Sequence, residues 1–229
     1  VEESSSSGTI VWVADEGNAN NDNAYINLLK GKGYTVQTPN LNQGGNRLNN
    51  NLSMLNDAVL IILGPNTNFR RFGNEKNTWN TITTPILCIQ QVTVQRDGMG
   101  WINSTNYGAY NNNIEIKQAS HPIFTGQNLS NGDLLKFNTG NTVYAMRTSS
   151  AGNGTILAQG VSGDRPPLAV VWEKGTPFYN GGMTPADTRM CLSFPWQGRL
   201  SQLTPQAISM FENAVQMLAL PPDNDKPLI

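Results

Sequence analysis

The sequence has very little histidine: His121 is the only one among 229 residues. A catalytic triad or dyad that needs an imidazole base would have to use this residue, and a site with several histidine ligands is excluded. No G-x-S-x-G string occurs, so the nucleophile of an α/β-hydrolase is not indicated. In the string SHPIF, His121 precedes Pro122, and we expect its imidazole to order the start of a loop by bonding to the backbone.

Cysteine is almost as scarce. Cys88 and Cys191 each lie inside an apolar run, which favours two buried thiols that pack as small hydrophobic side chains. Neither cysteine has the spacing of a metal site. A disulfide remains an alternative if the two strands are neighbours, because it needs α-carbons within about 7 Å of each other.

Charge is sparse as well. Lys and Arg number 15 and Asp and Glu number 16, which gives a formal net charge of -1 and a charged fraction of 14%. Because the basic residues are scattered, we expect no nucleic-acid partner. No apolar run approaches the roughly 18–20 residues that cross a bilayer, so we expect no membrane insertion.

Motifs for nucleotides and metals are also missing. The segments 64–66 (GPN) and 98–100 (GMG) lack the spaced glycines and the lysine of a nucleotide-binding loop, so we expect no cofactor. Carboxylates of Asp15, Glu16 and Asp22 could contribute to an oxygen-only calcium site. No regular calcium-loop motif contains them, and we expect no metal.

Asparagine takes the place of charge, with 30 residues that include runs at 49–51 and 111–113. Residues 1–8 (VEESSSSG) have the composition of a linker between domains. We interpret residues 9–220 as a single domain and residues 221–229 as a C-terminal tail. The low charge, the many asparagines and the serine tract favour a secreted, periplasmic or cell-surface protein with neighbouring domains in a longer chain.

The fold class follows from three continuous apolar runs at residues 9–15 (TIVWVAD), 58–64 (AVLIILG) and 85–90 (PILCIQ). Strands of a parallel sheet are covered on both faces and have this pattern. Segments with helical spacing lie between the runs at 20–30 and 47–55. We therefore predict a flavodoxin-like, three-layer α/β/α fold with a mostly parallel sheet.

The regular alternation stops between residues 91 and 161, where short β-like runs are separated by Gly, Asn and Ser. This pattern predicts a β-rich insertion of antiparallel strands at one edge of the sheet. We expect the parallel pattern to resume with core strands at 168–173 and 189–194. Thr204 and Pro205 then begin a final helix.

Eight strings follow one another along the chain: TIVWVAD, GKGYTV, DAVLIILGP, TPILCIQ, SHPIF, AVVWEKG, RMCLSFPW and LTPQAISMFENAVQMLAL. Their order resembles the class I glutamine-amidotransferase-like domains, and in particular the ThuA-like domains of secreted bacterial proteins that often lie beside carbohydrate-active modules. The resemblance covers residues 9–220. It implies a flavodoxin-like fold and, in many members, no established activity.

The catalytic residues of the family are not matched. The resemblance implies a cysteine on a glycine-flanked turn from strand to helix, with a His-Glu pair from a later loop. Here Cys88 lies inside its predicted strand without flanking glycines, and His121 is followed by Pro122 instead of x-Glu. We therefore expect no glutaminase activity.

Three functions remain open, and one of them is a purely structural spacer between neighbouring domains, which only the linker-like residues 1–8 support. Aromatic rings stack on sugars while amides and guanidinium groups bind the hydroxyls, so we favour an accessory carbohydrate-associated module. Trp79, Tyr107, Tyr110, Phe178 and Tyr179 are further aromatic candidates among polar neighbours, at least half of which we expect to pack under loops. The ligand-binding candidates at the carboxyl edge of the sheet are Asn66, Gln90, Gln91, Arg96, Trp101 and Trp196.

The alternative is a hydrolase that acts on a glycan or its ester. Asp15, Glu16 and Glu173 lie at predicted strand ends, where two carboxylates could face each other as general acid and base. We take these three as the catalytic candidates. Glu173 could instead pair with the adjacent Lys174.

Overall fold

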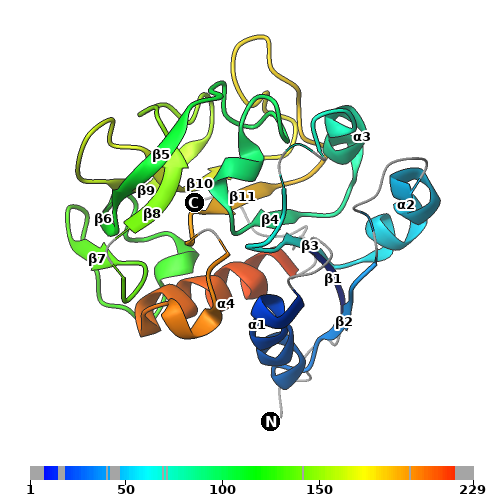
Figure 1. The fold of residues 1–229 in the computed structure, drawn as a ribbon, viewed down its shortest axis with the longest axis horizontal. Coiled ribbons are helices and arrows are strands. Elements are labelled where there is room, and N and C mark those ends of the chain that lie inside the picture. The colour runs from blue at the N-terminus through cyan, green and yellow to red at the C-terminus, as the bar shows by residue number, and fades with distance from the viewer. Residues whose placement is uncertain are drawn as a thin grey trace.

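The computed structural model describes residues 8–219 apart from 15–18, 40, 42–46, 69, 71, 141 and 196. The predicted linker, except Gly8, and the predicted tail lie outside the described residues. Figure 1 shows helices on both sides of a large central sheet. The helices and strands are β1 (Thr9–Val13), α1 (Ala19–Gly31), β2 (Thr35–Gln37), α2 (Arg47–Asp57), β3 (Leu60–Leu63), α3 (Lys76–Thr81), β4 (Ile86–Cys88), β5 (Tyr107–Asn111), β6 (Asn113–Ile116), β7 (Leu134–Lys136), β8 (Thr142–Met146), β9 (Thr155–Gly160), β10 (Pro167–Trp172), β11 (Arg189–Leu192) and α4 (Pro205–Ala219).

The central sheet has nine strands in the order β2-β1-β3-β4-β11-β10-β9-β6-β7. The first five of these run parallel to one another. Their order is that of a flavodoxin-like sheet, with β11 in the place of the fifth strand. The predicted fold class is confirmed, and so is the parallel, side-by-side placement of the three apolar runs.

The two faces of the parallel strands bury different side chains, because successive residues of a strand point to opposite faces. Ile10 and Trp12 of β1 pack in the cluster that contains residues of α1 and α4. Val11 and Val13 pack in the cluster that contains residues of α2 and α3. All four are 0% exposed, which explains why the strand is apolar at every position.

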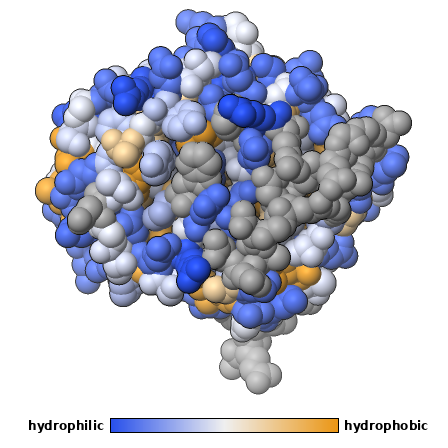
Figure 2. Space-filling view, in the orientation of Figure 1, coloured by the Kyte–Doolittle hydropathy of each residue, from blue (hydrophilic) through white to orange (hydrophobic). Residues whose placement is uncertain are grey.

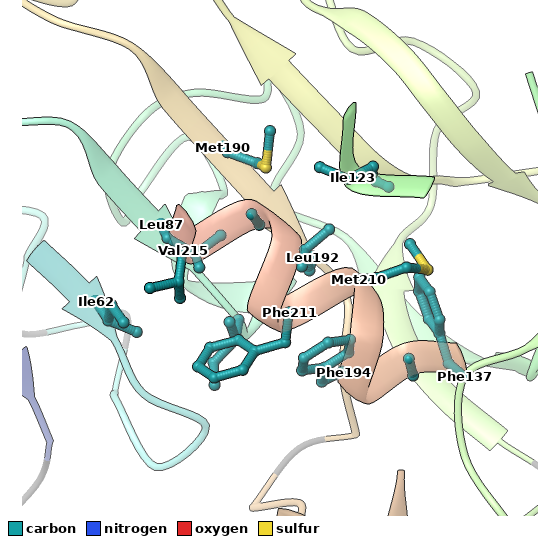
Figure 3. Close-up of a cluster of buried hydrophobic side chains, with 14 of the residues drawn as sticks. Ile62, Leu87, Ile123, Phe137, Met190, Leu192, Phe194, Met210, Phe211 and Val215 are labelled. Carbon is teal, nitrogen blue, oxygen red and sulfur yellow. The ribbon is translucent and has the colours of Figure 1, made fainter. Parts of the chain in front are cut away.

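The final helix, α4, covers the centre of one face. Its Thr204 cap accepts a hydrogen bond from the Ala207 N–H at 3.2 Å, and Pro205 takes the first helical position. Figure 3 shows Phe211 of α4 close to Phe194, with their ring centroids 6.4 Å apart. A buried side chain of this size contributes about 1.5–3 kcal/mol to stability. In the described part of the chain, no helix has the length and apolar character needed to span a membrane.

The predicted β-rich insertion is confirmed. Strands β6, β7 and β9 extend the sheet at one edge through antiparallel pairs. Strands β5 and β8 pair with each other and form a separate two-stranded sheet. These strands, coloured green to yellow, gather on the left of Figure 1.

The prediction that the parallel pattern resumes at residues 168–173 is wrong, because β10 runs antiparallel to both of its neighbours, β9 and β11. The short connection 161–166 joins β9 to β10 as a hairpin, and a hairpin joins antiparallel strands. All six residues of β10 are buried. Its apolar run therefore indicates that both faces of the strand are covered, but it does not indicate whether the strand runs parallel or antiparallel to its neighbours.

Arg189 is a fully buried charged residue, 0% exposed, at the start of a strand that we expected to be apolar. Its guanidinium donates to the carbonyl oxygens of Ile82 at 2.7 Å and Thr84 at 2.9 Å. Burial lowers the pKa of Arg189 to about 10, while Asp187 raises it. The side chain stays cationic at neutral pH and ties the connection between α3 and β4 to β11.

Cys88 and Cys191 lie opposite each other on the neighbouring strands β4 and β11. Both are free thiols and 0% exposed. Burial, together with the hydrogen bond to Cys88, raises the pKa of the Cys191 thiol. The prediction of two buried thiols is confirmed.

Candidate functional site

The carboxyl ends of β1, β3, β4 and β11 meet at one edge of the sheet, where a flavodoxin-like fold places its ligand crevice. Polar side chains do gather at this edge. All of them are buried, with at most 4% of each exposed. They are Asp22, Asn66, Thr67, Gln90, Gln91, Thr93 and Ser193.

Two side chains contact each other directly beyond the ends of β1 and β3. Asn66, which follows β3, donates from Nδ2 to Oδ1 of Asp22 in the first turn of α1, at 2.9 Å. One turn further along α1, the Tyr25 hydroxyl donates to the Gly198 carbonyl at 3.4 Å. Burial and, to a smaller extent, Asp22 raise the pKa of Tyr25, so its phenol remains a donor. Asn66 therefore holds the loop after β3 against α1.

Gln90 occupies the turn from β4 into the short 3-10 helix Gln91–Val94, which it caps. Its Oε1 accepts hydrogen bonds from both the N–H and the hydroxyl of Thr93, at 2.8 and 2.7 Å. The Thr93 hydroxyl lies 3.0 Å from the hydroxyl of Thr67, which donates to the Gly64 carbonyl. The acceptor atom of Gln90 is thus engaged within its own turn.

Gln91 and Trp101 are also engaged inside the protein. The Gln91 amide donates to the Pro167 carbonyl and accepts from the Met146 N–H, so it joins the turn to β10 and β8. Trp101 is 0% exposed and donates from Nε1 to Asn80 Oδ1 at 2.9 Å. A ligand cannot stack on this ring, because burial leaves neither of its faces open. The expected surface roles of Gln91 and Trp101 therefore do not match their positions.

The remaining candidates do not form one cluster among the described residues. Arg96 is exposed, with Nε 3.6 Å from Asp97 Oδ1. Glu173 is exposed and follows β10, which runs against the parallel strands, so it lies at the opposite edge of the sheet from the carboxyl end of β1. Three predicted site residues, Asp15, Glu16 and Trp196, lie outside the described residues.

Position also separates Glu173 from the end of β1 at Val13. Four strand spacings lie between β1 and β10 in the sheet, which is a lateral distance of about 19 Å. The two carboxylates of a glycosidase lie about 5–9.5 Å apart. The end of β1 therefore lies farther from Glu173 than this separation.

The described cysteine and histidine side chains do not form a catalytic pair. Cys88 packs in the cluster on the α2 and α3 side of the sheet. Ile123 and Phe124, which follow His121, pack on the α4 side. His121 Nδ1 accepts from the Ile123 N–H at 3.4 Å, which confirms its predicted bond to the loop backbone.

A polar hollow lies elsewhere, at the amino-terminal edge of the parallel strands. It has a volume of about 470 Å³. The turn before β9 and the connection that follows β10 supply most of its wall, since both lie at this edge. Its described lining residues are Asn103, Thr148, Ser150, Gly152, Asn153, Tyr179 and Asn180.

Hydrogen bonds join the two segments that form the hollow. Asn153 donates from its N–H to the Phe178 carbonyl at 2.8 Å and from Nδ2 to the Pro177 carbonyl at 2.9 Å. The Trp172 indole donates to the Ala151 carbonyl at 3.0 Å. Sequence reasoning singled out Tyr179 as an aromatic among polar residues but could not locate the hollow, because its walls are remote in sequence.

The aromatic candidates divide evenly among the described residues. Trp79, Trp101 and Phe178 are buried, as we expected for at least half of the set. Tyr107, Tyr110 and Tyr179 are partly exposed. Of these three, Tyr179 is the one that lines the hollow.

No protein-family model and no curated protein sequence matches the chain. The fold does match solved structures. A crystal structure from Thermoplasma acidophilum, assigned as one subunit of a GMP synthase, is 12% identical and superposes with a TM-score of 0.53 over 93% of this chain and 94% of that one. A glutamine amidotransferase from Thermotoga maritima is 9% identical, with a TM-score of 0.43 over 92% and 82% of the two chains. The chain thus has a glutamine-amidotransferase-like fold.

Proposed function

We propose that this chain is an accessory, carbohydrate-associated binding module of a secreted multidomain protein, related to the ThuA-like domains and without glutaminase activity. The observation that carries the absence of glutaminase activity is the turn after β4. There the Gln90 side chain is bonded to Thr93, and Cys88 lies two residues earlier inside the buried strand. The sheet separates this cysteine from the segment capped by His121.

The chemistry of the surface supports a neutral, hydroxyl-rich ligand. Charged residues make up 14% of the sequence, and 30 asparagines supply amides that both donate and accept hydrogen bonds. Figure 2 shows a face that is hydrophilic over most of its described area, with apolar residues in small separate patches. Such a surface suits sugars better than an apolar peptide or a membrane.

The absence of glutaminase chemistry is tested with the whole chain and free glutamine. We expect glutamate to form no faster than in buffer. The matched control is Cys88→Ala, which removes the thiol that lies two residues before Gln90. Glutamate formation that disappears in this variant would overturn the proposal.

Carbohydrate binding is tested by titrating the same chain with soluble neutral and acidic polysaccharides, with binding followed by affinity electrophoresis and calorimetry. We expect at least one neutral polysaccharide to bind. Failure of every polysaccharide would remove the carbohydrate part of the proposal.

A hydrolase is the second function that these experiments address. Glu173 lies at the opposite edge of the sheet from the end of β1, and the other catalytic candidates are Asp15 and Glu16. Chromogenic glycosides and acetyl esters, assayed from acidic to alkaline pH, should show no turnover. If the unchanged chain shows turnover and Asp15→Asn or Glu16→Gln loses it, the chain is an enzyme and the proposal of a binding module is wrong.

The secreted or cell-surface setting is part of the same proposal. It is supported by the low charge, the asparagine content and the serine-rich residues 1–8. Fractionation of the source cells with an antibody against this chain should recover it outside the cytoplasm. Recovery in the cytoplasm alone would contradict this part.

A further inference from the structure

We infer that the polar hollow at the amino-terminal edge of the sheet is the carbohydrate-binding site and takes one end or a short stretch of a neutral saccharide. The inference rests on the proposed carbohydrate-binding function and moves its site away from the carboxyl edge. At that edge, Gln90 and Gln91 are engaged with other parts of the protein. Trp101 is buried against Phe178 and leaves no ring face open to a ligand. The hollow instead presents partly exposed and exposed polar groups.

The size and charge of the hollow define the ligand class. Its volume of about 470 Å³ lies within the range of about 300–1,000 Å³ that small-molecule sites occupy. None of its seven described lining residues is charged. An ionic ligand would leave its hydration shell without a compensating charge, which is costly. A neutral ligand carries no such cost.

The hydrogen-bonding groups match hydroxyls, which both donate and accept. Ser150 Oγ accepts from the Gly152 N–H at 3.0 Å, so its own proton can be donated to another acceptor. Thr148 Oγ1 accepts from the Ser150 N–H at 3.1 Å and likewise retains a proton. Asn153 gives one amide proton to Pro177 and keeps its Oδ1 as an acceptor. The wall therefore offers donors and acceptors side by side.

Tyr179 supplies an aromatic surface. Its backbone carbonyl accepts from the Gly182 N–H at 2.8 Å. A side chain at Gly182 would come within 3.1 Å of the Tyr179 ring, so the glycine allows the turn to pack closely against it. The ring is partly exposed and is held in place by this turn. Sugars present C–H faces that stack on such a ring while their hydroxyls reach neighbouring amides.

The hollow is also ordered before any ligand arrives. The turn 148–153 is bonded to residues 177 and 178, and the Phe178 ring stacks on Trp101 with centroids 5.9 Å apart. Gly152 has a φ of 65°, a left-handed conformation that glycine adopts without strain. Preorganisation of this kind reduces the entropy lost on binding.

The test uses the whole chain with Tyr179→Ala and Asn180→Ala, titrated with whichever neutral polysaccharide the unchanged chain binds. We expect each variant to bind at least about tenfold more weakly, because a central aromatic or amide contact contributes about 1.4 kcal/mol or more. Matched controls are Tyr144→Ala, which removes another exposed tyrosine outside the hollow, and Asn77→Ala on α3. Both controls should bind within about twofold of the unchanged chain.

Two further measurements keep the outcomes distinct. The thermal midpoint of each variant shows whether the variant is folded. Tyr179→Phe keeps the aromatic ring and should therefore keep most of the polysaccharide binding. If Tyr179→Ala and Asn180→Ala bind the polysaccharide as well as the unchanged chain does, the hollow is not the binding site, and the proposed function is unaffected. Binding to an acidic polyuronate alone contradicts the neutral ligand class, and no binding to any glycan removes both proposals.

Discussion

His121 is a capping residue whose burial makes protonation unfavourable. Its Nδ1 accepts a hydrogen bond from the Ile123 N–H, which requires the unprotonated ring nitrogen. Burial lowers the pKa of His121 below its usual value of 6.5. At this position the lone histidine of the chain serves the local backbone.

A pH dependence of stability follows from this shift. Between the lowered folded pKa and 6.5, the unfolded chain binds more protons at His121 than the folded chain does, so the free energy of unfolding rises with pH across that window. We expect stability to fall as the pH drops from above 6.5 through the folded pKa. The measurement is urea denaturation at a series of pH values.

The control for this prediction is His121→Asn, which keeps a capping oxygen without a titrating group. Its loss of stability over the same window should be smaller than that of the unchanged chain. Carboxylates titrate at lower pH in both proteins and cancel in the comparison. Identical pH profiles for the two proteins would contradict the assignment.

Buried polar residues also show where residue-level reasoning succeeds and fails. The sequence predicted the role of His121 because Pro122 and a short apolar string follow it directly. It did not predict the burial of Arg189, whose acceptors lie on a segment more than 100 residues away. Local sequence cannot show that a distant loop offers carbonyl oxygens to a guanidinium group.

The turn 148–153 depends on glycine at the scale of the element. A side chain at Gly152 would overlap the carbonyl oxygen of Phe178, which also accepts the Asn153 N–H. Gly175 has a similar left-handed conformation, with φ 77° against 65°, but its missing side chain would meet open space. The two glycines differ in their surroundings more than in their backbone.

This difference gives a matched pair of variants. Gly175→Ala should cost about 1 kcal/mol from backbone strain alone. Gly152→Ala should cost about 2–3 kcal/mol, because the turn must also shift and weaken the hydrogen bond from the Asn153 N–H to the Phe178 carbonyl. Denaturant unfolding of both variants measures the difference. Equal losses in the two would show that the turn is free to move.

Strand direction marks the limit of prediction at this scale. The runs at 9–15, 58–64 and 85–90 were correctly predicted as parallel neighbours because helical segments separate them along the chain. The run at 168–173 has the same composition, yet it is antiparallel, since a short hairpin precedes it. Composition reports how many faces are buried, and the length of the connection decides the direction.

At the scale of the whole molecule, the two thiols lie at the centre of the nine-stranded sheet. Cys88 and Cys191 are 0% exposed, and their strands pair with each other near the middle of the strand order. A reagent in solution can reach them only when the central sheet opens. Their reactivity therefore reports global unfolding.

We expect an aromatic disulfide reagent to label both thiols of the denatured chain. Over the same reaction time, it should label neither thiol of the native chain. With added denaturant, the labelling rate should rise in step with unfolding monitored by tryptophan fluorescence. Asn77→Cys, which places a thiol at an exposed position of α3, should react at once and serves as the positive control. Rapid labelling of the native, unchanged chain would show that the sheet opens locally.

Local pattern alone settled the layered α/β class, the three parallel core strands and the capped final helix, since each depends on which faces of a segment are apolar or on which residues begin it. Tertiary structure decided the direction of β10, the engagement of Gln90, Gln91 and Trp101 inside the protein, and the polar hollow at the opposite edge of the sheet. The reason is physical. A segment's periodicity records how it is buried, whereas a site forms where segments distant in sequence meet and leave hydrogen-bonding groups facing solvent.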